Sequence, residues 1–317
     1  MMGFDTYNAA YSQVFKPNKL SVGIVVPIES YSMGPVPIMQ DHELRVKLVE
    51  NLGFSALWVR DVPFNVPTFG DAGQTFDPFT YLGFLAGKTS KIALGIASVA
   101  LPLHHPVHIA KAAASIDVLS QGRMLLGVAS GDRPDEYPAM GIAYEERGAL
   151  FRESVEYIRS AHRDFSVLNT KHLGDLNGLV DVLPKPFGKK IPLLVTGASQ
   201  QTLAWNAEFG DGWISYPKDL YTQAATLKQW RELVSKFHKF DRPFMQPLYI
   251  ILEKDADFKP QPIELGFRIG SNYLMDYLKS AEEIGVNHVA LNLRFNSRPI
   301  PEVLAELGEK IVPYFNN

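Results

Sequence analysis

The sequence predicts an α/β fold, a closed (β/α)8 barrel of the TIM-barrel type with insertions in its βα loops. Short apolar runs rich in Val, Ile and Leu alternate along the chain with segments of helical periodicity, as in parallel strands covered by helices. Glycines that can end a helix precede four of the runs, at Gly53, Gly122, Gly210 and Gly285. No G-x-G-x-x-G follows the first run, which argues against an open doubly wound sheet.

Eight buried strands are expected, at residues 20–28, 56–59, 92–98, 124–128, 191–197, 213–215, 245–253 and 289–293. Eight such strands, each followed by a helical segment, favour a barrel. Closed α/β barrels of about this length fold as one unit, so we expect residues 1–317 to form a single domain. Residues 1–19 are mixed in polarity and are expected to be a short arm leading into the first strand.

Composition excludes several classes of function. The formal net charge of -3 favours neither nucleic acid nor a membrane surface as a partner, and a cytoplasmic location is expected by default. The absence of Cys excludes disulfides, thiolate nucleophiles and iron–sulfur sites. The eight histidines have no H-E-x-x-H or comparable spacing, so no metal site is predicted.

Three segments are long for connections in a barrel, at residues 63–78, 164–190 and 254–270. They are rich in Pro, Gly and Asp, and we expect them to be lids or walls of a site, with mere surface insertions as the alternative.

Functional residues of such a barrel lie where its strands end. After the fifth strand, Gly197-Ala198-Ser199 is expected to lead directly into a helix at Gln200-Gln201-Thr202-Leu203-Ala204. Free N–H groups and the hydroxyls of Ser199 and Thr202 suit a phosphate, although an ordinary N-cap by Ser199 satisfies the same N–H groups. Ser130-Gly131 follow the fourth strand. The glycine would allow a flat ligand to approach closely, or the two residues simply end the strand.

Three motifs occur in order on successive strands: L-G-x-A-S-x-x-L-P-x-x-H-P, D-x-L-S-x-G-R-x-x-L-G-V-x-S-G and G-A-S-x-x-T. Each is short and unspecific alone, but the ordered set is specific. Over about residues 20–215 the chain resembles the bacterial-luciferase-like family of flavin-dependent barrel enzymes.

The resemblance implies FMN as the cofactor and assigns residues to it. The flavin ring would lie against a non-proline cis peptide at Ala97-Ser98, and the flavin phosphate would be bound by Ser199, Thr202 and Arg147. Luciferase has a further phosphate-binding Arg at the position of Ser130, so in this chain Arg147 would contribute more to binding the flavin phosphate.

Catalytic candidates are less specific. Arg60-Asp61 follow the second strand, where luciferases carry adjacent histidines, so light emission is not expected. The pair could bind a polar or carboxylate substrate, or form a structural ion pair. His104 and His105 lie on a loop beside the proposed cis peptide, where one of them could donate to the flavin; alternatively, the His before Pro106 caps the next helix. Charged residues after the fourth strand could line the opening of the barrel at the C-terminal ends of its strands, or form a solvated loop: Asp132, Arg133 and Glu136.

The resemblance therefore implies a flavin-dependent oxidoreductase, a monooxygenase that uses reduced flavin and O2 on an organic small molecule. Without a dinucleotide fingerprint, reduced flavin would come from a separate reductase. A homodimer is also implied. The alternatives are hydride transfer with F420, whose polyglutamyl tail would favour a more basic chain, and a flavin-binding protein without turnover.

Overall fold

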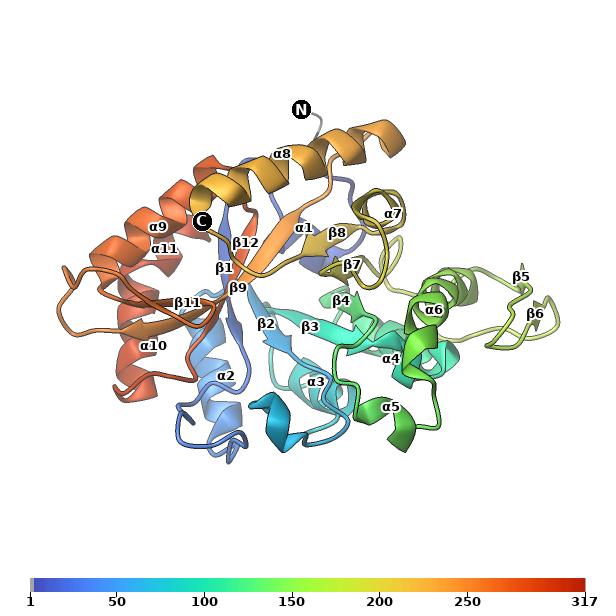
Figure 1. Ribbon diagram of the computed structural model, residues 1–317, viewed down its shortest axis with the longest axis horizontal. Coiled ribbons are helices and arrows are strands. Elements are labelled where there is room, and N and C mark those ends of the chain that lie inside the picture. Colours follow the sequence, from blue (N-terminus) through green and yellow to red (C-terminus); the bar gives the residue numbers. More distant parts are fainter. Residues whose placement is uncertain (1–2, 317) are drawn as a thin grey trace.

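The computed structural model describes residues 3–316, and a closed barrel of eight parallel strands lies at its centre (Figure 1). Strands β1 and β12 pair with each other, and β8 pairs with β9, which closes the ring. The predicted barrel is confirmed, and each predicted strand overlaps an observed one. In ring order the strands are β1 (Ser21–Val25), β2 (Ala56–Val59), β3 (Ala93–Ala100), β4 (Met124–Ala129), β7 (Leu193–Thr196), β8 (Gly212–Ile214), β9 (Phe244–Leu252) and β12 (His288–Asn292).

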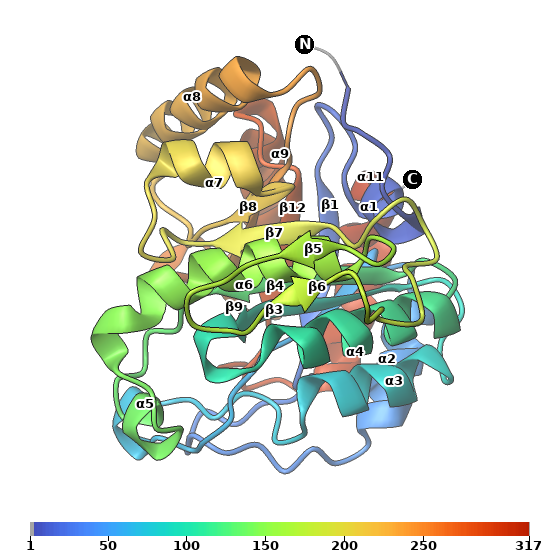
Figure 2. The ribbon, with the colours of Figure 1, turned by 90° about the vertical axis from the view of Figure 1, so that its right-hand side faces the viewer.

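Helices follow the strands and cover the outside of the barrel (Figures 1 and 2). Side-chain caps and prolines fix several starts: Asp77 accepts from Thr80 N at 2.7 Å at the start of α3, and α3 and α4 both begin with Pro. The eight main helices are α2 (His42–Asn51), α3 (Pro78–Ala86), α4 (Pro106–Leu119), α6 (Arg147–Ala161), α7 (Leu203–Phe209), α8 (Leu220–Phe237), α9 (Ser271–Glu283) and α10 (Ile300–Lys310).

Shorter helices lie between these units, at η1 (Pro67–Phe69), η2 (Leu101–Leu103), α5 (Glu136–Ala139) and η3 (Tyr144–Glu146), and α11 (Val312–Phe315) follows the last of them. Within residues 3–316 no helix has the length and apolar character needed to cross a membrane.

The N-terminal segment is folded, which corrects the expectation of an arm. Asn8 caps α1 (Ala9–Val14) by accepting from Tyr11 N at 3.0 Å. Tyr11 and Val14 are fully buried in a cluster with inward-facing strand residues such as Leu125 and Leu194. This short helix therefore plugs the N-terminal end of the barrel. It is only six residues long, too short for helical periodicity to stand out.

Two of the three long segments reach the C-terminal end of the barrel. Residues 63–78 contain η1, and residues 254–270 form β10 (Gln261–Ile263) and β11 (Gly266–Ile269), with β11 parallel to the end of β9. Residues 164–190 lie elsewhere and correct the expectation: they connect α6 to β7, an αβ connection, with a small hairpin of β5 (Val167–Leu168) and β6 (Leu176–Asn177) outside α6 (Figures 1 and 2).

Candidate functional site

A cavity of about 400 Å³ lies at the C-terminal ends of the strands. Its floor includes Trp58, Met245 and Ala290 from the barrel interior, and Phe69 and Leu265 reach it from the two long loops. A volume of this size is typical of small-molecule sites, which commonly occupy about 300–1,000 Å³. Nine of the twelve predicted site residues line it: Arg60, Asp61, Ala97, Ser98, Ser130, Gly131, Gly197, Ala198 and Ser199.

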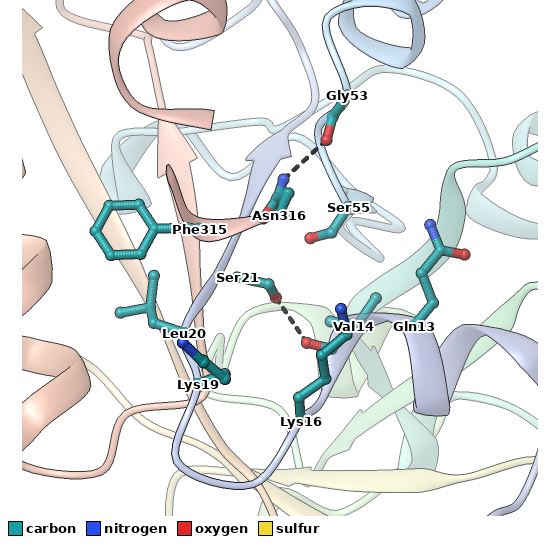
Figure 3. Close-up of a pocket in the computed structure, with 10 residues that line it drawn as sticks. All are labelled: Gln13, Val14, Lys16, Lys19, Leu20, Ser21, Gly53, Ser55, Phe315 and Asn316. Atoms are coloured by element: carbon teal, nitrogen blue, oxygen red, sulfur yellow. Dashed lines mark hydrogen bonds between the residues drawn. The ribbon is translucent and has the colours of Figure 1, made fainter. Parts of the chain in front are cut away.

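A second, smaller cavity of about 100 Å³ lies at the opposite end, beside α1 (Figure 3). Its polar side chains already serve the fold. Ser21 Oγ donates to the carbonyl oxygen of Val14 at 2.7 Å, and Asn316 Nδ2 donates to the carbonyl oxygen of Gly53 at 2.9 Å. The cavity at the C-terminal ends of the strands is therefore the candidate site.

One wall of the candidate site consists of small side chains from neighbouring strands. Ala97, Ser98 and Ala100 come from β3, and Ala129 comes from β4. The Ala97-Ser98 peptide bond is cis, as the resemblance implies. Small side chains leave a surface that a flat ring can approach closely.

The fold itself requires a glycine at position 131. Its φ is +77°, and a Cβ there would lie 2.6 Å from the hydroxyl of Tyr137. That hydroxyl donates to the carbonyl oxygen of Ser130. The contact gives the Ser130-Gly131 exit a structural explanation, which sequence reasoning missed because nothing in the sequence pairs it with Tyr137.

The turn after β7 exposes backbone donors to the cavity. Ser199 (φ 47°) and Gln200 (φ 58°) are left-handed, and Gln201 N donates to the carbonyl oxygen of Ala198 at 2.9 Å. The N–H groups of Ala198, Ser199 and Gln200 have no hydrogen-bond partner in the part of the chain that the structure describes. Successive free N–H groups in a turn form an anion-binding concavity.

Two predicted phosphate ligands, Thr202 and Arg147, are not among the residues that line the cavity. Thr202 caps α7 by accepting from Trp205 N at 3.1 Å. Arg147 begins α6, where its guanidinium stacks 3.6 Å from the ring centroid of Tyr144 and donates to the Tyr144 carbonyl oxygen at 2.7 Å. Tyr144 itself lines the cavity.

Arg60 and Asp61 are neighbours in sequence but have different partners. Arg60 Nη2 lies 2.8 Å from Asp71 Oδ2, whereas Asp61 Oδ2 accepts from His104 Nε2 at 2.7 Å and from Ala100 N at 3.1 Å. Burial alone lowers the pKa of His104, but the hydrogen bond and charge of Asp61 outweigh it and raise that pKa above 6.5.

His104 does not line the cavity; it supports Asp61, which does. The His before Pro106, His105, caps the following helix by accepting from Val107 N, as the capping alternative predicted.

Asp71, which the sequence analysis did not single out, contacts several arginines near the cavity. Besides Arg60, it lies 3.2 Å from Arg294 Nη1, and its Oδ1 accepts from Tyr31 and Gly73 N. Burial by itself raises the pKa of Asp71, but the arginines and the Gly73 N–H lower it below its usual range. It lies in an aperiodic loop, so only the need of a buried Arg60 for a counter-ion could have pointed to it.

A model of the luciferase-like monooxygenase family matches residues 20–257. An uncharacterised protein of Mycobacterium tuberculosis is 33% identical over 190 residues, or 55% of this chain and 67% of that protein. An alkanal monooxygenase beta chain of Photorhabdus luminescens is 39% identical over 93 residues, 29% of each chain. An F420-dependent hydroxymycolic acid dehydrogenase of M. tuberculosis is 26% identical over 211 residues, 65% of this chain and 55% of that enzyme.

Solved structures share the fold at low identity. A monooxygenase from Streptomyces bottropensis superposes with a TM-score of 0.76 at 19% identity, covering 93% of this chain and 99% of that one. An F420-dependent secondary alcohol dehydrogenase superposes with a TM-score of 0.75 at 17% identity, covering 92% of this chain and 98% of that one. An FMN complex of a Baeyer–Villiger monooxygenase component from Pseudomonas putida superposes with a TM-score of 0.73 at 13% identity, covering 93% of this chain and 98% of that one. Because the family model matches well over half of its length, this chain belongs to the luciferase-like monooxygenase family, a family of oxidoreductases.

Proposed function

We propose that this chain is an FMN-dependent monooxygenase that uses reduced flavin and O2 on an organic small molecule. The observation that carries the proposal is a cavity that has both a wall of small side chains and, after β7, a turn with free N–H groups. A flavin mononucleotide has a flat ring and a terminal phosphate, and these two surfaces fit its two ends.

The residues present fit such a cofactor. Ala97 and Ser98 would contact the ring, and the N–H groups of residues 198–200 with Ser199 would bind the phosphate. The hydroxyl of Thr196 is buried at the cavity and has no partner among residues 3–316, so a polar ligand group would satisfy it.

Bound flavin supplies the electron and oxygen chemistry, while the barrel orients the reactants and excludes water. Trp58 and Met245 close the floor, and Phe69 and Leu265 cover the cavity from the two long loops. A separate reductase would deliver the reduced flavin, since the sequence has no dinucleotide-binding fingerprint.

F420-dependent hydride transfer is a second candidate. The observation that favours it is the match to an F420-dependent dehydrogenase, which extends over 211 residues, against 93 for the alkanal monooxygenase chain. The net charge of -3 favours FMN over a cofactor with a polyglutamyl tail.

Anaerobic titration of the purified chain with FMN, reduced FMN, riboflavin and F420 tests both candidates. We expect reduced FMN to bind, FMN to bind more tightly than riboflavin, and admission of O2 to reoxidise the bound reduced flavin. Tight binding of F420 with no binding of either FMN form would replace the first candidate by the second. Binding of none of the four would contradict both.

A further inference from the structure

A second polar surface of the cavity is distinct from the turn after β7. Arg60 follows β2, and Arg133 lies in the connection after β4; both line the cavity. Strands β2 and β7 are three places apart in the ring of eight, so Arg60 lies nearly opposite the turn after β7. A ligand could therefore contact Arg60 at one end and the turn after β7 at the other.

Both arginines are held in place by one residue. Arg60 Nη2 donates to Asp71 Oδ2 at 2.8 Å, and Arg133 Nη2 donates to the Asp71 carbonyl oxygen at 2.9 Å. Arg133 also lies over the ring of Phe69, 4.3 Å from its centroid. These contacts bring the two guanidinium groups together in a fixed orientation, as a preformed site requires.

Each guanidinium keeps a donor unused. Arg60 Nε and Arg133 Nη1 are buried and have no hydrogen-bond partner within residues 3–316. Arg133 is only 7% exposed, and its Nη1 lies 3.9 Å from Glu136 Oε1, too far for a hydrogen bond. A buried charged group with an unpartnered donor is costly, and since both residues line the cavity, a negative charge in the cavity would offset part of that cost.

The neighbouring charges also favour an anion in the cavity. Three arginines, Arg60, Arg133 and Arg294, surround two carboxylates, Asp71 and Glu136.

The other acidic groups of the cavity do not remove this excess of positive charge. Asp61 is occupied by His104 and by the Ala100 N–H, and Asp132 is exposed to solvent.

We propose that Arg60 and Arg133 bind the carboxylate of the substrate, and that the substrate is an organic acid with an apolar body. The planar guanidinium matches a carboxylate in geometry and charge. Apolar and aromatic side chains, Phe69 and Tyr249 among them, line the cavity beside the pair and suit the body of such a molecule. The inference rests on the proposed function, because it names the substrate of that oxidoreductase.

Calorimetry on the purified chain, with and without FMN, tests it with benzoate and its neutral counterpart benzamide. We expect benzoate to bind at least tenfold more tightly than benzamide. Arg133→Met should abolish the preference, and Arg133→Lys should restore part of it. Arg163→Met is the matched control, because Arg163 is exposed and bonds to Ser160 outside the cavity. Thermal unfolding checks that each variant is folded. If a variant does not fold, the comparison of benzoate with benzamide on the wild-type chain still tests the inference.

A further comparison separates the substrate's carboxylate from the cofactor's phosphate. If the pair serves the substrate, Arg133→Met leaves the ratio of FMN to riboflavin affinity unchanged, and inorganic phosphate does not displace benzoate. A collapse of that ratio in the variant would assign the pair to the cofactor and overturn the inference. Equal binding of benzoate and benzamide would also overturn it, whereas FMN binding would still uphold the proposed function. A benzoate preference without FMN or F420 binding would uphold only the anion site.

Discussion

Trp58 Nε1 donates a 2.8 Å hydrogen bond to Nε2 of His288 inside the barrel. Since an indole nitrogen only donates, Nε2 must be the unprotonated nitrogen, and Nδ1–H then donates to Ser21 Oγ at 2.7 Å. The hydroxyl of Ser21 in turn donates a hydrogen bond to the carbonyl oxygen of Val14 (Figure 3). The chain of bonds joins the N-terminal plug to the floor of the cavity, and it requires neutral His288.

Two glycines make room for this pair. A Cβ on Gly95 would lie 2.3 Å from the Trp58 ring, and a Cβ on Gly23 would lie 2.7 Å from His288 Nε2. The barrel therefore accommodates a large indole under the cavity only because these strand positions carry no side chain.

The first prediction is that His288 destabilises the fold in acid. Burial lowers the pKa of His288 from 6.5 to about 3. Between these values the unfolded chain binds a proton that the folded chain does not, so the free energy of unfolding falls as pH falls, by about 1.4 kcal/mol per pH unit from this group. Urea unfolding of wild type and His288→Gln from pH 4 to 8 should show a shallower slope for the variant below pH 6.5. Equal slopes would contradict the assignment.

The second prediction concerns His104, whose pKa is raised above 6.5. The stability that protonated His104 gains from Asp61 is fully present below pH 6.5 and is lost as pH rises through the folded-state pKa. His104→Gln should therefore cost more stability at pH 5.5 than at pH 9, by on the order of 1.5–3 kcal/mol.

A double-mutant cycle with Asp61→Asn checks the source of this effect. The pH dependence should vanish in the Asp61→Asn background, because Asp61 Oδ2 is the acceptor of the His104 bond at 2.7 Å. A loss of stability that is the same at both pH values would mean that the ion pair is not its cause.

Sequence patterns predicted the strands and the cavity wall well because both follow from local rules. Near-continuous apolar runs mark buried parallel strands, and residues directly after them must meet at one end of the barrel. Ion-pair partners follow no such rule. Consecutive residues in an extended chain point in opposite directions, so the adjacency of Arg60 and Asp61 suggested a pair that the backbone does not allow. Their partners Asp71 and His104 come from other loops.

The third prediction separates phosphate binding from helix capping. Ser199→Ala should weaken FMN binding by about tenfold or more while leaving riboflavin nearly unaffected, because a lost bond to a charged group costs about 1.5–3 kcal/mol. Thr202→Ala removes the α7 cap and should cost about 1 kcal/mol of stability. It should leave the ratio of FMN to riboflavin affinity unchanged, since Thr202 does not line the cavity. Fluorescence titration with both flavins, together with thermal unfolding, measures these effects.

The last prediction concerns Ala97, which lines the cavity on β3. A bulkier side chain there projects into the space assigned to the flavin ring, so Ala97→Leu should weaken flavin binding at least a hundredfold and shift the unfolding midpoint by only a few degrees. Ala93→Leu is the matched control: Ala93 lies on the same strand and in the same interior cluster, but it is completely buried. There the added carbons overpack the barrel and should cost about 1–3 kcal/mol without a selective loss of flavin. If Ala97→Leu behaves like the control, Ala97 is part of the packed interior and the ring binds elsewhere.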